Sequence, residues 1–194
     1  NRQIHATLNT VGQVKAEVMK DRILSINSEC NVVIKKEILN GNVKDFFENE
    51  KYDYVIDAID MIKSKVELIK YCSENDIDLI SSMGFGNKMN PEMIKITDIS
   101  KTIMCPLARK MRKLLRAENI GELTVAYSEE EALKPDKSAK YKTETLTEYR
   151  DHNTLPKKTT PGSNAFVPGT AGFIISAYVI RKLLEEMWNE NIVR

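Results

Sequence analysis

Histidine and cysteine are scarce in this sequence, and their scarcity excludes several kinds of site. Two of the 194 residues are His and three are Cys. His5 and His152 are too few for most metal clusters or His-based catalytic triads. Cys30, Cys72 and Cys105 form no C-x-x-C pair, and an odd count does not suggest a disulfide framework. The simplest interpretation is a protein of a reducing compartment, and we expect it in the cytoplasm.

Neither sign of charge is in excess, because 29 Lys and Arg residues stand against 28 Asp and Glu residues. The formal net charge of +1 argues against nucleic-acid binding by bulk charge, although it is compatible with a local basic patch. An apolar signal segment is also lacking, and the chain opens on Asn1 without Met, so we expect a fragment or trimmed product with no membrane partner. The composition, 42% hydrophobic and 29% charged, predicts one soluble domain.

Helix-like and strand-like apolar patterns alternate along most of the chain. Ala16, Met19, Ile23 and Ile26, for example, recur at the spacing of one helix face. Strands that alternate with helices predict right-handed crossovers, and therefore an α/β fold with a Rossmann-like, mostly parallel sheet flanked by helices. The predicted strands are 31–36, 52–57, 77–82, 93–98 and 122–128, and the predicted helices are 12–26, 43–49, 62–72, 106–118 and 169–189.

Polar residues follow two of the predicted strands directly. Asp57 and Asp60 come at the end of the second strand, and the small residues of 81–86 come at the end of the third. Parallel sheets of this kind bind their ligands at the carboxyl ends of the strands. These residues therefore mark the expected ligand edge.

Two segments depart from this alternation. Residues 134–163 are polar and rich in Lys and Thr, which predicts a functional or mobile loop. Residues 169–189 are apolar on nearly all sides as far as Tyr178, yet the apolar part is shorter than the roughly 20 residues that span a bilayer. We therefore expect a buried helix or the face of a homodimer.

Three charged residues have the chemistry of a nucleoside triphosphate site. Arg2 offers a planar fork of donors and Lys15 a compact positive charge, both suited to phosphate oxygens. Asp60, beyond a strand end, has an oxygen ligand for Mg²⁺. Each residue alone is typical of a solvated surface. Their combination, in this order and spacing, favours the nucleotide site.

The motifs that contain these residues resemble a known family. Asn1-Arg2-Gln3, Val-Gly-Gln-Val-Lys-Ala at 11–16 and Tyr-Val-Ile-Asp-Ala-Ile-Asp at 54–60 are similar to the ATP-binding core of the ubiquitin-activating-like adenylyltransferases (ThiF/MoeB/HesA). The motifs at 96–102, 106–112 and 161–168 resemble most closely the tRNA threonylcarbamoyladenosine dehydratase branch (TcdA or CsdL). The resemblance covers nearly the whole chain.

The resemblance implies an enzyme that activates a carboxylate with ATP. Arg2, Gln3 and Lys15 would hold the ATP, and Asp60 would hold Mg²⁺. In the tRNA branch the carboxylate belongs to the threonyl group of a modified adenosine, and its activation permits ring closure with loss of water. One alternative is activation of the C-terminus of a small sulfur-carrier protein, with that carrier or a cysteine desulfurase as partner. Another is a non-catalytic dimerisation or RNA-binding piece.

The sequence also departs from the family pattern. The family's Gly-rich phosphate loop and its ribose-binding acid lie upstream of Asn-Arg-Gln and are not in this chain, which predicts a domain truncated at its N-terminus, 1–194, that binds ATP poorly or not at all. Met61 stands where sulfur-carrier activators commonly have Asn, and paired C-x-x-C zinc motifs are absent. Both departures weaken the sulfur-carrier alternative.

Two further features are candidates for chemistry or RNA contact. Cys105, before a proline at a predicted helix start, could be a nucleophile, although an unactivated Cys more often packs as a small hydrophobe. The helix that follows has basic residues at i, i+3, i+4 and i+7, and this stripe could track RNA phosphates or be an ordinary solvated face. The stripe consists of Arg109, Arg112, Lys113 and Arg116.

Overall fold

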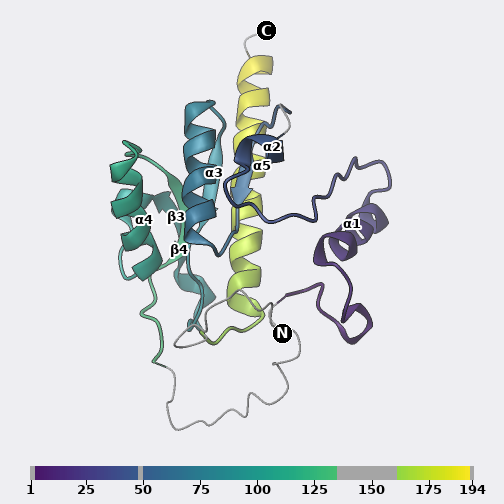
Figure 1. The fold of residues 1–194 in the computed structure, drawn as a ribbon, viewed down its shortest axis with the longest axis horizontal. Coiled ribbons are helices and arrows are strands. Elements are labelled where there is room, and N and C mark those ends of the chain that lie inside the picture. The colour runs from purple at the N-terminus through teal and green to yellow at the C-terminus, as the bar shows by residue number, and fades with distance from the viewer. Residues whose placement is uncertain (1–2, 48–49, 135–160, 193–194) are drawn as a thin grey trace.

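The computed structural model describes residues 3–47, 50–134 and 161–192 and shows a four-stranded sheet flanked by helices (Figure 1). The strands are β1 (Val55–Asp57), β2 (Leu79–Ser82), β3 (Ile94–Asp98) and β4 (Thr124–Ser128). The α-helices are α1 (Lys15–Ile26), α2 (Val43–Phe47), α3 (Ile62–Glu74), α4 (Pro106–Ala117) and α5 (Phe166–Ile192). Short 3₁₀ helices are η1 (Leu8–Thr10), η2 (Pro91–Met93) and η3 (Ile99–Lys101).

The sheet has the strand order β1-β2-β4-β3 and is mostly parallel, as the sequence pattern predicts. β1 pairs with β2 and β2 with β4 in parallel, whereas β3 runs antiparallel to β4. The carboxyl ends of β1, β2 and β4 therefore meet at one edge of the sheet, which we call the carboxyl edge. The loops that follow Asp57 and Ser82, the last residues of β1 and β2, leave from this edge.

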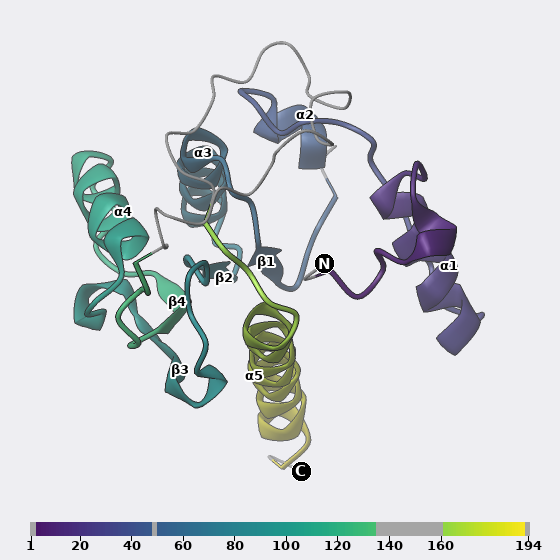
Figure 2. The same cartoon turned by 90° about the horizontal axis from the view of Figure 1, so that it is seen from below.

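The two faces of the sheet are covered by different helices (Figure 2). Successive residues of a strand point to opposite faces. Val125 and Tyr127 pack with residues of α3 and α4, while Ala126 between them packs with Ile175 and Val179 of α5. All three β4 residues are almost completely buried, which makes β4 the centre of the core.

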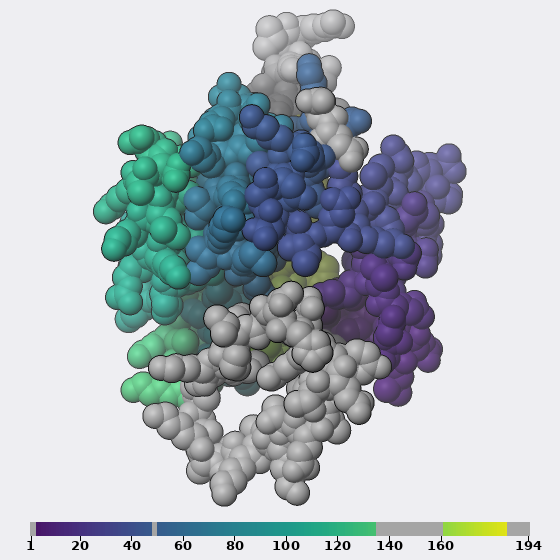
Figure 3. All heavy atoms as spheres, viewed as in Figure 1, coloured from purple at the N-terminus to yellow at the C-terminus, as the bar shows by residue number. Residues whose placement is uncertain are grey.

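The N-terminal residues lie to one side of the sheet (Figures 1 and 3). No residue of α1 is buried, and Ile26 at its end is 77% exposed. The strand predicted at 31–36 is wrong, because this segment is irregular and Val33 is 75% exposed. A strand needs a partner, and among the described residues the edge of β1 away from β2 pairs with no strand.

Helix α5 is longer than predicted. Its buried residues recur every four positions, at Val167, Ala171, Ile175 and Val179, so one stripe of the helix packs on the sheet. The expectation that its apolar part is too short for a bilayer is wrong, because 166–185 is long and apolar enough to cross one by length and composition. One such helix is a weak indication, since core helices meet the same criterion.

The two segments that flank residues 135–160 both form hydrogen bonds with Asn87, which follows β2. Asn87 donates its backbone N–H to the Gly162 carbonyl at 2.8 Å and accepts from the Leu133 N–H at 2.7 Å. Its Oδ1 accepts from the Gly162 N–H at 2.5 Å. Asn87 has a φ of 58°, a left-handed conformation that Asn tolerates better than most residues. The loop expected at 134–163 thus has its flanks at the carboxyl edge, while 135–160 lie outside the described residues.

Candidate active site

A cluster of buried polar side chains joins the carboxyl ends of β1 and β2. Asp57 lies in register with Ser81, and both side chains are fully buried together with that of Lys65 from α3. Lys65 Nζ lies 2.7 Å from Asp57 Oδ2. Ser81 Oγ donates to the same oxygen at 2.6 Å and accepts from Lys65 Nζ at 3.1 Å. Lys65 Nζ also donates to the Ser82 carbonyl oxygen at 2.9 Å.

These contacts satisfy a charged lysine inside the protein. Burial lowers the pKa of Lys65 overall, although the charge of Asp57, its hydrogen bond and the charge of Asp60 act in the opposite direction. An ammonium has three donors, and Lys65 has acceptors on Asp57, Ser81 and Ser82. A neutral amine would leave the Asp57 carboxylate without a compensating charge, so the geometry is that of a buried ion pair.

Asp60 lies in the loop between β1 and α3 and is exposed. The loop starts with a local turn in which Asp57 Oδ1 accepts from the Ile59 N–H at 3.0 Å. No described residue forms a hydrogen bond with the Asp60 carboxylate. Its oxygens are therefore available to a ligand at the carboxyl edge, where the sequence places the site.

A magnesium ion fits this arrangement when phosphate oxygens share its coordination. The described residues contain no group of three or more His, Cys, Asp or Glu side chains that could hold a metal ion by themselves. Mg²⁺ usually takes only one or two protein carboxylates and completes its octahedron with water and substrate phosphates. Asp60 offers one such carboxylate, and the donor set of this edge suits a nucleotide-bound ion.

The other predicted nucleotide ligands lie in the N-terminal part. Arg2 is outside the described residues. Gln3 is half-buried, and Lys15 is the exposed first residue of α1. No hydrogen bond or ion pair among the described residues joins Lys15 to Asp60. Direct contacts therefore do not bring these two predicted nucleotide ligands together.

Sequence reasoning missed Lys65 and singled out Ser81 only as part of a strand end. The available signal was the position of Lys65 on α3. It shares the buried face of that helix with Leu68, Ile69 and Cys72, where an amphipathic pattern calls for an apolar residue. A lysine on such a face needs a buried acceptor, and Asp57 lies eight residues earlier at a strand end.

The three cysteines have different environments. Cys105 is the N-cap of α4, with its Sγ accepting from the Ala108 N–H at 3.5 Å, and it packs in the core against α3 and α4 residues. This packing favours the structural interpretation of Cys105. Cys72 is buried, and burial raises the pKa of its thiol to about 11. Cys30 is exposed.

The basic residues of α4 divide into two groups. Arg109, Lys113 and Arg116 are exposed. Arg112 is half-buried, and its Nη1 donates to the Ile99 and Thr102 carbonyl oxygens at 3.1 Å each and to the Thr102 hydroxyl. Arg112 therefore holds the turn before α4, and the free cationic face consists of the other three residues.

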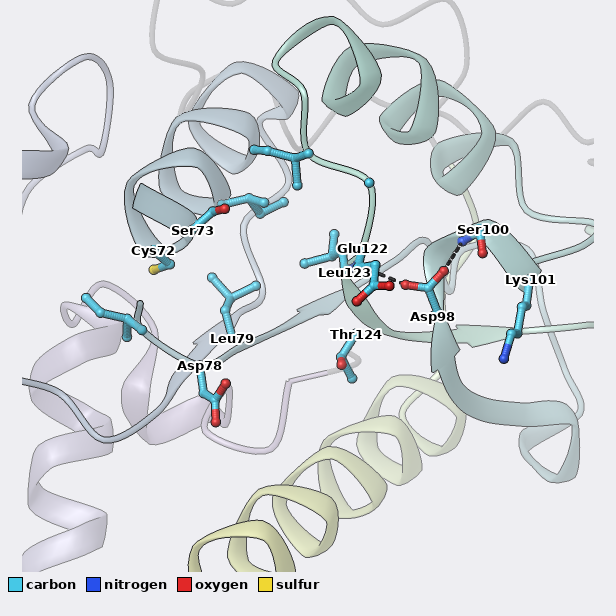
Figure 4. A pocket seen from close by; sticks show the side chains of 14 residues that line it. Cys72, Ser73, Asp78, Leu79, Asp98, Ser100, Lys101, Glu122, Leu123 and Thr124 are labelled. Carbon is cyan, nitrogen blue, oxygen red and sulfur yellow. Dashed lines mark hydrogen bonds between the residues drawn. The ribbon is translucent and has the colours of Figure 1, made fainter. Parts of the chain in front are cut away.

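A pocket of about 770 Å³ (Figure 4) lies at the edge of the sheet opposite the carboxyl edge. Leu79 and Thr124, which begin β2 and β4, line it together with Asp98. Burial alone would raise the pKa of Asp98, but hydrogen bonds from Ser100 and Leu123 and the charge of Lys101 lower it overall. Asp98 thus caps η3 and braces the start of β4, and none of the predicted nucleotide residues that the structure describes lines this pocket.

The ThiF family matches residues 1–193, and the chain belongs to this family. It is 41% identical over 189 residues to the tRNA threonylcarbamoyladenosine dehydratase of Bacillus subtilis, covering 96% of this chain and 72% of that protein. It is 43% identical over 118 residues to the enzyme of the same name from Escherichia coli, covering 61% of this chain and 44% of that protein.

Solved structures show the same fold. E. coli TcdA in complex with AMP matches with a TM-score of 0.80 and 32% identity over 97% of this chain and 72% of that one. The complex of TcdA with ATP matches with a TM-score of 0.80 and 32% identity, covering 97% of this chain and 71% of that one. The predictions of the family and of the Rossmann-like fold are confirmed.

Proposed function

We propose that this protein is an ATP-dependent tRNA threonylcarbamoyladenosine dehydratase. The observation that carries the proposal is the 41% identity over 96% of the chain to a dehydratase of that name. The fold supports it, since TcdA, with a TM-score of 0.80 to this chain, has been solved with both ATP and AMP. A tRNA substrate and a cytoplasmic location follow from the same assignment.

The proposed reaction activates the threonyl carboxylate of the modified adenosine. A carboxylate oxygen attacks the α-phosphorus of ATP, the bond to the bridging oxygen breaks, and pyrophosphate leaves with the bonding electrons. A nucleophilic atom of the same substituent then attacks the activated carbonyl carbon. A ring closes, and AMP leaves with the former carboxylate oxygen. Because the nucleophile also loses a proton, the nucleoside loses the elements of water overall.

The residues contribute mainly by electrostatics, as is usual for transfer at phosphorus. Arg2 and Lys15 would hold the phosphates and balance the charge that grows on pyrophosphate, with Gln3 beside them. Asp60 would hold Mg²⁺, which supplies charge neutralisation on the phosphate oxygens when bound. The exposed, unbonded carboxylate of Asp60 at the carboxyl edge supports this part of the proposal.

The exposed face of α4 is the proposed tRNA contact. Arg109, Lys113 and Arg116 recur at i, i+4 and i+7, so they form one row about 10 Å long. A row of this kind can contact successive phosphates, with an affinity that falls as salt rises. Arg112 has a different role, because its guanidinium is bonded to Ile99 and Thr102.

The outer face of α5 is the proposed homodimer contact. Phe173 is 76% exposed and Ile180 56% exposed, on the side of the helix away from the buried stripe. Exposed apolar side chains of this size on one helix face are typical of an interaction surface. A second copy of the chain would cover them.

The substrate is tested with the purified full-length enzyme, ATP and two acceptors. We expect AMP and pyrophosphate to form with tRNA that carries threonylcarbamoyladenosine, and mass spectrometry to show that nucleoside lighter by one water. Turnover only with a small sulfur-carrier protein would overturn the proposal and establish the alternative adenylyltransferase. No ATP turnover or binding under either condition would favour the non-catalytic alternative.

A further inference from the structure

The buried ion pair at the carboxyl edge is an unusual use of a lysine. Lys65 and Asp57 have no exposed side-chain surface, and removing two charges from water is expensive. Replacing such a pair with apolar residues of similar volume is often neutral or stabilising in other proteins. Folding stability alone therefore does not explain a lysine at this position, and its contacts indicate a more specific task.

The contacts of Lys65 connect three separate elements. Its backbone belongs to α3, and its ammonium reaches Asp57 at the end of β1. The same ammonium reaches the Ser81 hydroxyl and the Ser82 carbonyl at the end of β2. Lys65 therefore fixes the start of α3 against both strand ends at once.

Only a short loop separates β1, which ends at Asp57, from α3, which carries Lys65. Residues 58–61 connect Asp57 to the start of α3, and Asp60 is the one acidic residue among them. Asp57 binds the loop through Oδ1, to the Ile59 N–H, while its Oδ2 binds Lys65 and Ser81. At the other end the Met61 carbonyl accepts from the Lys65 N–H at 2.9 Å. The Asp57 side chain thus holds the start of the loop, and the Lys65 side chain holds the first turn of α3, into which the end of the loop leads.

We propose that Lys65 is a positioning residue, whose bridge from Asp57 to the end of β2 fixes the 58–61 loop and so sets where the Asp60 carboxylate meets a nucleotide-bound Mg²⁺. The inference rests on the proposed function, because it takes Asp60 as the magnesium ligand. A carboxylate in a tethered four-residue loop loses little conformational freedom when it binds an ion. Residues that orient a metal ligand in this way contribute about 10–100-fold to metal affinity or activity.

The test needs a variant that removes the bridge without burying an unpaired charge. The double variant Asp57→Asn/Lys65→Met removes both charges and keeps side chains of similar size, so we expect it to fold. Asp60→Asn removes the proposed ligand itself. Lys63→Met is the matched control, because Lys63 lies on the same helix with a side chain that is 69% exposed. Circular dichroism and thermal unfolding establish that each variant is folded.

The readout is ATP affinity measured by calorimetry with Mg²⁺ and with EDTA, using the full-length enzyme. We expect the gain in ATP affinity from Mg²⁺ to be equal in wild type and Lys63→Met, and to fall about 10–100-fold in both Asp60→Asn and Asp57→Asn/Lys65→Met. The affinity in EDTA should stay the same in all four proteins. A structural role alone would shift the melting temperature without changing the gain from Mg²⁺.

Two results would overturn the proposal, and they are distinguishable. If Asp60→Asn loses the gain from Mg²⁺ while the folded double variant keeps it, Lys65 does not position Asp60, and the proposed function stands. If neither variant loses the gain, Asp60 does not bind the ion, and the positioning role fails with it. Dehydration of tRNA by the wild-type enzyme tests the proposed function separately.

Discussion

The sheet region and the N-terminal residues 3–42 have similar proportions of apolar residues, but these residues are buried to very different extents. In the sheet region Ile80, Val125 and Ala126 have no exposed surface, and helices cover both faces. In the N-terminal region α1 has no buried residue, and Leu8 and Ile26 are 94% and 77% exposed. The apolar periodicity of a segment therefore predicts that a helix forms, whereas the burial of that helix depends on a neighbouring element.

The largest expected effect is in the buried ion pair of the sheet region. Lys65→Met leaves the Asp57 carboxylate buried without its cation, and we expect a loss of about 3–5 kcal/mol in the free energy of unfolding. Urea denaturation measures it. The control Lys63→Met should change stability by less than about 0.5 kcal/mol. Equal effects of the two substitutions would mean that Lys65 is solvated.

A similar comparison can be made with apolar residues. Leu115→Ala creates a cavity next to β4, since Leu115 is 1% exposed, and should lower stability by about 2–5 kcal/mol. Ile26→Ala at the end of α1 should change it by less than about 0.5 kcal/mol. Urea denaturation checks both variants. A large effect of Ile26→Ala would show that α1 packs against another part of the protein in solution.

A smaller effect separates the two groups of basic residues on α4. Arg112→Ala leaves the Ile99 and Thr102 oxygens without their donor and should lower stability by about 1–3 kcal/mol. Arg109→Ala should leave stability unchanged but weaken tRNA binding and reduce the slope of log affinity against log salt by about 1. Thermal unfolding and filter binding over a salt series measure the two properties. The opposite pattern would mean that Arg112 contacts RNA and Arg109 supports the fold.

The sequence predicts the sheet region well because its signals are local. Short β-branched runs that end in Asp57 and Ser82 gave the two strand ends, and parallel pairing brings such ends to one edge. The prediction of a strand at 31–36 is wrong, because a strand forms only beside a partner strand and no local pattern reveals that partner. The same limit explains α5, whose apolar sequence does not show that only one stripe is covered among its described side chains, 166–185.

The site was predicted less completely than the fold. Asp60 at a strand end was expected, and the structure places it at the carboxyl edge. Lys65 was missed because its partners lie on two other elements, and a charged residue in a helix is usually solvated. Helical spacing groups Arg112 with the other basic residues of α4. Its side chain nevertheless points about 100° around the helix from that of Lys113, and its guanidinium binds Thr102.

The role of Asp60 is tested most directly when the two edges of the sheet are compared in one assay. Asp60 stands at the carboxyl edge, and Glu122 lines the large pocket at the other. ATP-dependent dehydration of threonylcarbamoyladenosine in tRNA is measured by mass spectrometry for wild type, Asp60→Asn and Glu122→Gln. We expect Asp60→Asn to abolish product formation and Glu122→Gln to form product at the wild-type rate. Loss of activity in Glu122→Gln with activity kept in Asp60→Asn would contradict this expectation.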